Sequence, residues 1–351
     1  MFKTLRNLTV NIIAAFIGDK NARQRFRKKY KVKSNYRKLK DDNAKLFKEN
    51  MAIRQEINEI SQHLLKIDSK LFAISNSSTD RTRVYLSIVC MALNEGPYIK
   101  EWIEYHKLVG VERFYFYDNG SNDNTREILE PYIKGGVVVY IQADGYGVQG
   151  AIYNDAVWKY RYQTYWLALI DLDEFLVPVE KTSMYEVLID FEKYPGVALN
   201  WVCFDTNGHK TKPTQHGGLV TANYTRVNKD YNIGMNRHIK SIVNPRKVQY
   251  VINPHCSKYT DGYAVTENFD SVSGAFTKYH SSNKIRINHY FTKSQEEYLS
   301  RDAIRQQFSR FGRISNVQKH WQFEQDFEES TNDVAIQKYL PKLKIAMGIL
   351  D

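Results

Sequence analysis

The sequence predicts an α/β protein with a Rossmann-like, mostly parallel sheet covered by helices on both faces. Two observations support this. Apolar, β-branched runs alternate with segments of helical length between residues 84 and 204, and the apolar run 165–170 ends abruptly in the acids of Asp171-Leu-Asp-Glu174. Strands that alternate with helices join by right-handed crossovers into a parallel sheet. Such sheets bind ligands at the carboxyl ends of their strands, so the acids there predict a site.

The first 38 residues carry all of the excess positive charge. The net charge is +11, and residues 1–38 hold twelve Lys or Arg and one acid, which leaves 38 residues of each sign elsewhere. The apolar run 8–18 is about half as long as the roughly twenty residues that span a bilayer. With the basic tract behind it, this run indicates an interfacial helix on an anionic membrane surface. The alternatives are a solvated basic helix and, without support from any motif, a nucleic-acid partner. We therefore expect residues 1–31 to associate with a membrane and the chain to bind no nucleic acid.

A heptad pattern follows from Val32 to Ile74, with steps that alternate between four and three residues over six heptads. This spacing predicts a coiled coil over 32–75 and a homo-oligomer, followed by a polar linker at 76–83. The number of strands stays open. Asn43 and Asn50 at a positions favour a register-fixed dimer, whereas Leu at a and Ile at d further along favour a tetramer.

The first half of the globular part has clear boundary signals. Pro97 suits the first turn of a helix, and Gly110 ends that helix. No Gly-x-Gly-x-x-Gly follows the first strand, which disfavours a nicotinamide or flavin cofactor. In chain order we expect strands at 84–92, 114–117, 137–141 and 165–170, and helices at 97–109, 125–133 and 149–162.

The acidic cluster is the candidate metal site. The acids lie at the tip of the strand, and we expect Asp171 and Asp173 to project to the same side, because strand side chains alternate. Two carboxylates are suited to holding Mn²⁺ or Mg²⁺ against a diphosphate. The alternative is that these acids cap the following turn. In either case, buried acids at a sheet edge are costly unless a cation compensates them.

The second half is expected to contain an antiparallel section. We expect a helix at 183–194 and a strand at 197–204, then strands at 237–243 and 248–252 in which Arg237 and Lys240 are available to a diphosphate. A last strand gives way to a helix within 285–294. Three cysteines, Cys90, Cys203 and Cys256, lie far apart in apolar or strand-like contexts. We expect reduced thiols, as is typical of a cytoplasmic protein, and no role in metal binding.

Three segments resemble a known group of enzymes. They are Ala92-Leu-Asn-Glu-Gly-Pro-Tyr-Ile-Lys-Glu-Trp-Ile-Glu-Tyr-His106, Gly110-Val-Glu-Arg-Phe-Tyr-Phe-Tyr-Asp-Asn-Gly-Ser-Asn-Asp-Asn-Thr125 and Asp171-Leu-Asp-Glu-Phe175. In this order they resemble nucleotide-sugar glycosyltransferases of the GT-A fold, within which the chain is most similar to the family 92 and family 2-like group. The resemblance implies a GT-A domain over 84–300. Beyond it, where the resemblance ends, we expect C-terminal helices at 301–351.

The resemblance also implies roles for individual residues. Asn94, Glu95 and Asp118 fall where the family binds the nucleoside, although Asp118 is also suited to close an Asx-turn. His289 falls where a late histidine completes the metal shell, with a satisfied core histidine as the alternative. An inverting transferase needs a base at the acceptor hydroxyl. Of Asp205, Asp261 and Glu267, we favour Asp205 because it ends a strand of the same sheet.

The resulting prediction is a metal-dependent, inverting glycosyltransferase. It would use a nucleoside diphosphate sugar, UDP-linked in most of the group, and a polysaccharide, oligosaccharide or lipid-linked glycan as acceptor. We expect it on the inner face of a bacterial membrane. The alternatives are a nucleotidyl- or phosphotransferase with the same acidic pair, and a coiled-coil scaffold with a degenerate transferase domain.

Overall fold

The computed structural model describes residues 84–145, 147–307 and 329–349, together with isolated positions between 20 and 56; side chains between 302 and 307 are not described. The chain divides into two compact units, Met1–Thr79 and Asp80–Asp351. Apart from those isolated positions, the predicted membrane segment, coiled coil and linker lie outside the described residues. In the part that is described, we find no helix with the length and apolarity needed to cross a membrane.

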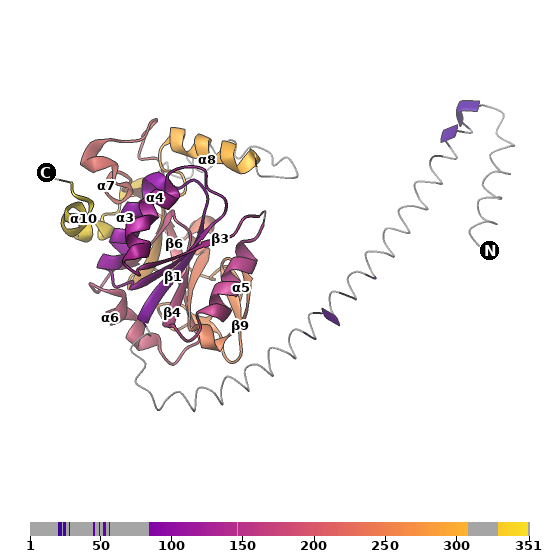
Figure 1. Ribbon diagram of the computed structural model, residues 1–351, viewed down its shortest axis with the longest axis horizontal. Helices are drawn as coiled ribbons and strands as arrows, with labels where there is room; N and C mark the ends of the chain where they lie inside the picture. The colour runs from indigo at the N-terminus through magenta and orange to yellow at the C-terminus, as the bar shows by residue number, and fades with distance from the viewer. Residues whose placement is uncertain are drawn as a thin grey trace. The chain divides into compact units, whose positions relative to one another are not determined.

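A large mixed sheet forms the centre of the second unit (Figure 1). Its strands run in the order β12-β11-β6-β8-β4-β1-β2-β3. The β4-β1-β2-β3 half is parallel throughout, whereas β8 is antiparallel to both β4 and β6. The predicted parallel sheet with an antiparallel section is therefore confirmed. The strands on this path are β1 (Val84–Ala92), β2 (Arg113–Asp118), β3 (Val138–Gln142), β4 (Thr164–Leu169), β6 (Gly196–Cys203), β8 (Ile239–Val243), β11 (Ala264–Val265) and β12 (Ser271–Val272).

Alternation along the strands gives the sheet two apolar faces. In β1, Leu86, Ile88 and Cys90 belong to one buried cluster and Val89 belongs to another. Each face needs a cover, and Figure 1 shows α3 and α4 on one side and α5 with β9 (Val248–Asn253) on the other. The bounds of the helices are α3 (Gly96–Leu108), α4 (Thr125–Lys134), α5 (Gln149–Lys159), α6 (Met184–Leu188), α7 (Val220–Asn223), α8 (Gln295–Gln307) and α10 (Leu340–Met347), and those of the 3₁₀ helices are η1 (Ile189–Phe191), η2 (Gln215–Gly218), η3 (Gly234–Arg237), η4 (Pro245–Lys247) and η5 (Ala335–Tyr339).

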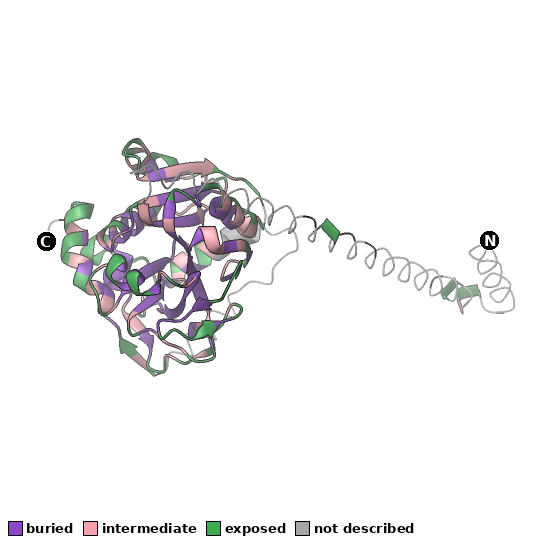
Figure 2. Cartoon of the chain, turned by 90° about the horizontal axis from the view of Figure 1, so that it is seen from below, coloured by how far each residue is buried: buried purple, intermediate pink, exposed green. Residues whose placement is uncertain are grey.

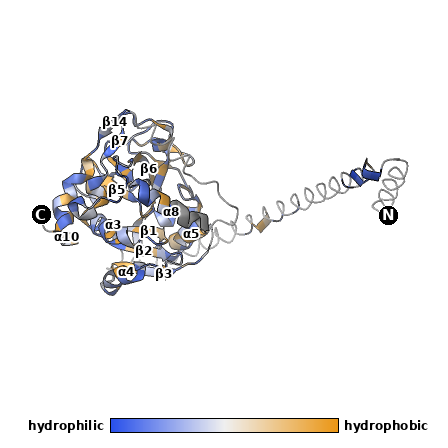
Figure 3. Ribbon diagram, turned by 90° about the horizontal axis from the view of Figure 1, so that it is seen from above, coloured by the Kyte–Doolittle hydropathy of each residue, from blue (hydrophilic) through white to orange (hydrophobic). Residues whose placement is uncertain are grey.

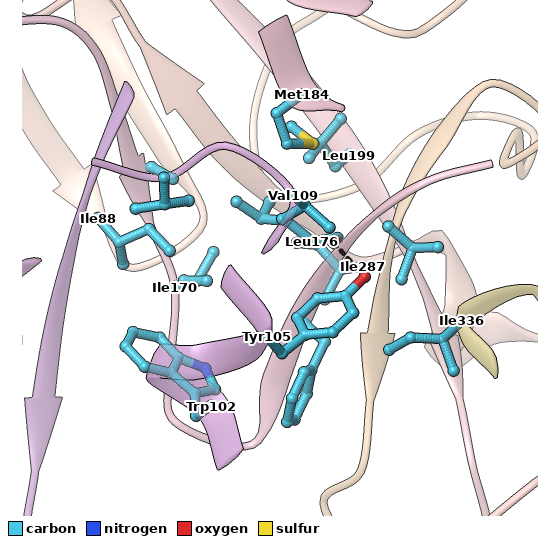
Figure 4. Packing of buried hydrophobic residues seen from close by; sticks show 14 of the residues in the cluster. Ile88, Trp102, Tyr105, Val109, Ile170, Leu176, Met184, Leu199, Ile287 and Ile336 are labelled. Carbon is cyan, nitrogen blue, oxygen red and sulfur yellow. Dashed lines mark hydrogen bonds between the residues drawn. The ribbon is translucent and has the colours of Figure 1, made fainter. Parts of the chain in front are cut away.

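Helix α3 anchors the strand that follows the acidic cluster. The indole nitrogen of Trp102 donates to the carbonyl of Glu174 at 2.8 Å, and the Tyr105 hydroxyl donates to the carbonyl of Leu176 at 2.9 Å. Figure 4 shows Trp102 and Tyr105 among the aliphatic side chains of the core. His106 is fully buried, accepts from the backbone of Leu176 at 3.1 Å, and has its pKa lowered by burial to about 3. This neutral, hydrogen-bonded face fixes β5 (Glu174–Pro178) next to the acidic cluster.

Strand β5 (Glu174–Pro178) pairs antiparallel with β13 (Ile285–His289), which in turn runs parallel to β6. Since β6 and β4 both run antiparallel to β8, they share a direction, and the end of β13 reaches the same sheet edge as the ends of β1 and β4. The register places His289 opposite Glu174. The backbone of Tyr290 also donates to the carbonyl of Asp173 at 2.9 Å. A residue from late in the chain is thus held beside the acidic cluster.

One expectation about the acidic cluster is corrected. Strand β4 ends at Leu169. Asp171 and Asp173 lie in a turn rather than on a continuing strand, and Glu174 is the first residue of β5. The backbone of Asp171 donates to the Glu174 carboxylate at 2.9 Å, and the backbone of Glu174 donates to the carbonyl of Asp171 at 3.1 Å. Strand alternation therefore does not explain why Asp171 and Asp173 face the same space. The turn conformation, which the sequence left as the alternative, does.

The segment beyond residue 300 packs within the same unit. It contains a strand as well as helices, since β14 (Ser330–Asn332) pairs with β7 (Arg226–Asn228), and α10 packs against α3. Figure 2 shows the buried residues concentrated in the strands, and Figure 3 shows hydrophilic residues along the helices and loops around them. All three cysteines are free and buried, as expected. The remaining pair of strands is β9 (Val248–Asn253) with β10 (Cys256–Tyr259).

Candidate active site

A cavity of about 910 Å³ opens where several strands end. Its lining comes from the segment after β1, the β4–β5 turn, the starts of β8 and α5, and the junction between β13 and α8. In the sheet order β4 lies between β8 and β1, so the acidic turn after β4 lies between the start of β8 and the segment after β1. This is the edge at which open α/β sheets bind ligands. The cavity therefore agrees in position with the site that the sequence predicts.

Asp171 is held by three donors of the chain. Its Oδ2 pairs with Lys240 Nζ at 2.8 Å, while its Oδ1 accepts from Gln149 Nε2 at 2.7 Å and from the Tyr153 hydroxyl at 3.1 Å. Lys240 is 1% exposed and also lies 3.4 Å from the Glu174 carboxylate. Burial acts to raise the pKa of Asp171, but Lys240 and, more weakly, His289 together hold it below its usual value. Asp171 is therefore ionised, and both of its oxygens are occupied.

Among the described residues, Asp173 has a hydrogen-bond partner for one carboxylate oxygen and none for the other. Its Oδ2 accepts from Arg301 Nη1 at 2.6 Å, and its Oδ1 faces His289 Nε2 at 3.6 Å, which is too long for a hydrogen bond. Burial acts to raise the pKa of Asp173, yet Arg301 and His289 hold it well below its usual range. Each acid of the turn thus has a cation of the chain beside it. This is the compensation that buried acids at a sheet edge require.

Asp173 and His289 fit a divalent cation better than Asp171 does. Two ligands that each lie about 2.0–2.2 Å from one ion can be 3.6 Å apart, which is the separation of Asp173 Oδ1 and His289 Nε2. The other ring nitrogen of His289 is buried without a hydrogen-bond partner inside the described ranges. In those ranges no group of three His, Cys, Asp or Glu side chains is gathered as a ready-made metal site. Asp171 could reach an ion directly only by giving up one of its donors.

The predicted nucleoside residues fall into two groups. Asn94 and Glu95 line the cavity, but Asp118 does not. Asp118 Oδ1 accepts from the backbone of Ser121 at 2.8 Å, and its Oδ2 accepts from the Tyr140 hydroxyl at 2.7 Å, so the turn-closing alternative describes its contacts. Asn94 holds the same loop, because its Oδ1 accepts from the backbone of Asn122 at 2.8 Å.

The candidates for a catalytic base lie away from the cavity. Asp205 is fully buried and paired with Arg226. Glu267 is also buried and accepts from three consecutive backbone N–H groups, at 283–285, whereas Asp261 is exposed. Arg237, which we expected at a diphosphate, is exposed and does not line the cavity either. Lys240 does line it, but its ammonium is already paired with the acidic turn.

Two cations of the site were missed by sequence reasoning. Arg301 lies on α8, and no spacing rule connects it with Asp173, which is 128 residues earlier. Lys293 lies four positions after His289, inside a segment that the sequence did mark as the end of a strand. A basic residue so close in sequence to the predicted metal ligand His289 was the signal from which Lys293 could have been predicted. Both residues line the cavity.

Comparison with known proteins gives a consistent family. The profile of glycosyltransferase family 92 matches residues 87–343. A glycosyltransferase family 92 protein of Oryza sativa is 28% identical over 253 residues, which covers 70% of this chain and 38% of that protein. A galactan beta-1,4-galactosyltransferase of Arabidopsis thaliana is 28% identical over 239 residues, covering 62% and 42%. The chain thus spans about two fifths of the length of these two relatives.

Among solved structures, S. aureus TarS covers 76% of this chain and 88% of its own, with 14% identity and a TM-score of 0.33. A likeness of that size does not establish a shared fold. The family profile, in contrast, extends from β1 into α10 and so includes the whole cavity. On this match over most of its length, the chain belongs to glycosyltransferase family 92.

Proposed function

We propose that this protein is a metal-dependent glycosyltransferase that moves a sugar from a nucleoside diphosphate sugar to a glycan. The observation that carries the proposal is the pair Asp173 Oδ1 and His289 Nε2, 3.6 Å apart at the edge of a 910 Å³ cavity. A carboxylate and an imidazole are suitable ligands for Mn²⁺. Family membership makes a sugar donor the natural ligand of this site.

We assign different roles to the residues that line the cavity. Asn94 and Glu95, after β1, would contact the nucleoside, and Asp173 with His289 would hold the cation at the diphosphate. A divalent cation bound there supplies positive charge that stabilises the departing diphosphate. Lys240 and Asp171 keep the turn in place through their 2.8 Å ion pair. Holding these groups in fixed positions lowers the reorganisation that the reaction requires.

The donor, acceptor and stereochemistry are finer proposals. We take UDP-galactose as the first donor to test and a galactan as the first acceptor, because the Arabidopsis relative is named as a galactan galactosyltransferase. Inversion needs a base within reach of the acceptor hydroxyl. The position of Asp205, buried against Arg226, gives this role no support. Glu296 is the first replacement to test, since it lines the cavity and is exposed.

A panel of nucleotide sugars, each incubated with galactan oligosaccharides with and without Mn²⁺, tests the function. The proposal expects release of the nucleoside diphosphate together with a lengthened glycan, and loss of both on chelation. Release of pyrophosphate from a nucleoside triphosphate and a sugar phosphate would instead identify a nucleotidyltransferase. If no donor gives turnover, the result would favour the alternative of a coiled-coil scaffold with a degenerate transferase domain.

Two proposals concern the N-terminal residues. We propose that residues 1–31 attach the protein to the inner face of a membrane and that residues 32–75 join chains into an oligomer. Deleting 1–31 should abolish sedimentation with anionic vesicles, because each basic residue near such a surface contributes about 1 kcal/mol. Light scattering should give a multimer for the full chain and a monomer for residues 80–351. Equal sedimentation with and without residues 1–31 would contradict the membrane proposal. An equal number of chains per particle for the full chain and for residues 80–351 would contradict the oligomer proposal.

A further inference from the structure

Lys293 is a buried cation with no hydrogen bond to any described residue. It lies between β13 and α8, its side chain is 4% exposed, and it lines the cavity. Its one ion pair in that part of the chain is with Glu95 Oε2 at 4.0 Å, beyond hydrogen-bonding distance. Its ammonium also lies 3.9 Å from the centre of the Tyr98 ring. A buried ammonium whose three donors lack acceptors is costly.

Lys240 shows what a compensated lysine in this cavity looks like. It is buried to a similar extent, 1% exposed, but has Asp171 Oδ2 at 2.8 Å and Glu174 Oε2 at 3.4 Å. Burial lowers the pKa of Lys293, whereas the neighbouring acids raise that of Lys240 in spite of burial. The two lysines differ in their partners, not in their depth. Lys293 lacks the anion that Lys240 has.

The position of Lys293 is fixed by its surroundings. Its φ of 50° is in the left-handed region, which a residue other than glycine adopts only where its neighbours impose it. The next residue, Ser294, forms a reciprocal cap with Glu297, whose backbone donates to Ser294 Oγ at 3.3 Å and whose carboxylate accepts from it at 2.6 Å. The same carboxylate accepts from the Tyr98 hydroxyl at 2.6 Å. Glu297 thus holds both the backbone beside Lys293 and the ring beneath its ammonium.

The missing anion belongs beside the acidic turn. Arg301, about two helical turns further along, is paired with Asp173 at 2.6 Å, and Asp173 is the acid that faces His289. Lys293 and Arg301 therefore place two positive charges next to the proposed cation ligands. Phosphate oxygens are charged acceptors with which lysine and arginine side chains form short, strong hydrogen bonds.

We propose that Lys293 binds a phosphate group of the nucleoside diphosphate, in the donor sugar and again in the product. The proposal rests on the proposed function for the identity of the ligand, but the anion site itself does not depend on sugar transfer. During transfer the bond between the anomeric carbon and the diphosphate oxygen breaks, and that oxygen retains the electron pair. Lys293 would then stabilise the charge that develops on the diphosphate.

The experiment compares two lysines that contact the same ring. Lys212 also lines the cavity, and its ammonium lies 4.7 Å from the centre of the Tyr98 ring, but Lys212 is exposed. Isothermal titration calorimetry on the full chain would measure the affinity for inorganic pyrophosphate, UDP and uridine in the wild type, Lys293→Met and Lys212→Met. Thermal denaturation without ligand would report whether each variant is folded.

We expect Lys293→Met to weaken pyrophosphate and UDP binding by about 10- to 100-fold, as loss of a charge-assisted contact does. Uridine binding should change by less than about threefold, and Lys212→Met should have a similarly small effect on all three probes. The Tm of unliganded Lys293→Met should equal or exceed that of the wild type, because the variant removes an uncompensated buried charge.

Three results would overturn the proposal: no pyrophosphate binding by the wild type, equal losses in the two variants, or a lower Tm for Lys293→Met with unchanged pyrophosphate affinity. The last would mean that the contact with Glu95 is the whole role of Lys293. Failure of the proposed function looks different. A wild type that binds pyrophosphate through Lys293 but transfers sugar from no donor would uphold the anion site and refute the transferase.

Discussion

The acidic β4–β5 turn and the basic β13–α8 junction meet at one cavity, yet they balance their charges differently. In the turn, Asp171 and Asp173 each have a cation of the chain within 2.6–2.8 Å. At the junction, Lys293 has no carboxylate closer than 4.0 Å among the described residues. Charges that are fully paired hold the protein in shape, because removing either partner leaves the other buried and uncompensated. A charge left unpaired in a cavity is available to a ligand.

The largest effect is expected for Lys240→Met. It would leave Glu174, which is fully buried, and Asp171, which is 35% exposed, without their cation. We expect the free energy of unfolding to fall by about 3 kcal/mol, at the lower end for a broken buried pair because Asp171 retains contact with water. Urea denaturation measures this. Lys293→Met is the control, and an equal loss of stability in both variants would erase the distinction between the two regions.

Asp173→Asn tests the oxygen that faces His289. The change keeps the shape of the side chain but removes the charge that would bind a cation. We expect turnover to fall by about 100-fold or more, equivalent to about 2.7 kcal/mol in the barrier, with the fold intact. Initial rates at saturating Mn²⁺ and circular dichroism provide the measurements. A rate within threefold of the wild type would remove Asp173 from the metal site.

Asp205→Asn asks whether a carboxylate outside the cavity takes part in the reaction. Asp205 is fully buried and pairs with Arg226, so the variant should lower the free energy of unfolding by about 1–3 kcal/mol. Turnover should stay within about threefold once the protein is folded. Steady-state kinetics below the melting transition would show this, and a loss of a hundredfold or more in turnover would restore Asp205 as the base.

His106 provides a small effect that depends on pH. Its folded-state pKa is lowered to about 3 by burial, while the unfolded value is about 6.5. Between these values the unfolded chain binds the extra proton, so stability is lost as pH falls below about 6.5, by up to about 1.4 kcal/mol per pH unit. Urea denaturation from pH 7 to pH 4 should give a shallower loss for His106→Gln than for the wild type. Parallel curves would mean that His106 binds its proton equally in the folded and unfolded states, which would contradict the lowered pKa.

Local patterns were sufficient to predict most of the sheet. Strand β1 has the predicted bounds, Val84–Ala92, and α4 differs from its predicted end by one residue. These elements follow apolar periodicity and nearby stop signals such as Gly110, which depend only on adjacent residues. The acidic cluster was predicted as a site for the same reason. Its backbone was wrong, because the hydrogen bonds between Asp171 and Glu174 close a turn that periodicity does not reveal.

The composition of the site could be predicted only in part, because its members come from distant strands. Asp171, Asp173, Lys240 and His289 do line the cavity, whereas Asp118 and Arg237 do not. Arg301 reaches Asp173 only because α8 folds back over the cavity, and nothing near Arg301 in the sequence marks that path. Asp205 was favoured because it lies at the end of a strand. Successive side chains of a strand point to opposite faces of the sheet, so this position alone does not place a side chain in the cavity. The Asp205 side chain faces Arg226 instead.

The pairing of β5 with β13 has a consequence for the order of events during synthesis. The ribosome completes the acidic turn and β5 well before Ile285 and His289 exist, so β5 must wait as an unpaired edge strand. Such an edge is open to other strands until the correct partner emerges. Nascent chains arrested before residue 285 should therefore depend on chaperones, and the proposed cation between Asp173 and His289 could be held only after translation has passed this strand.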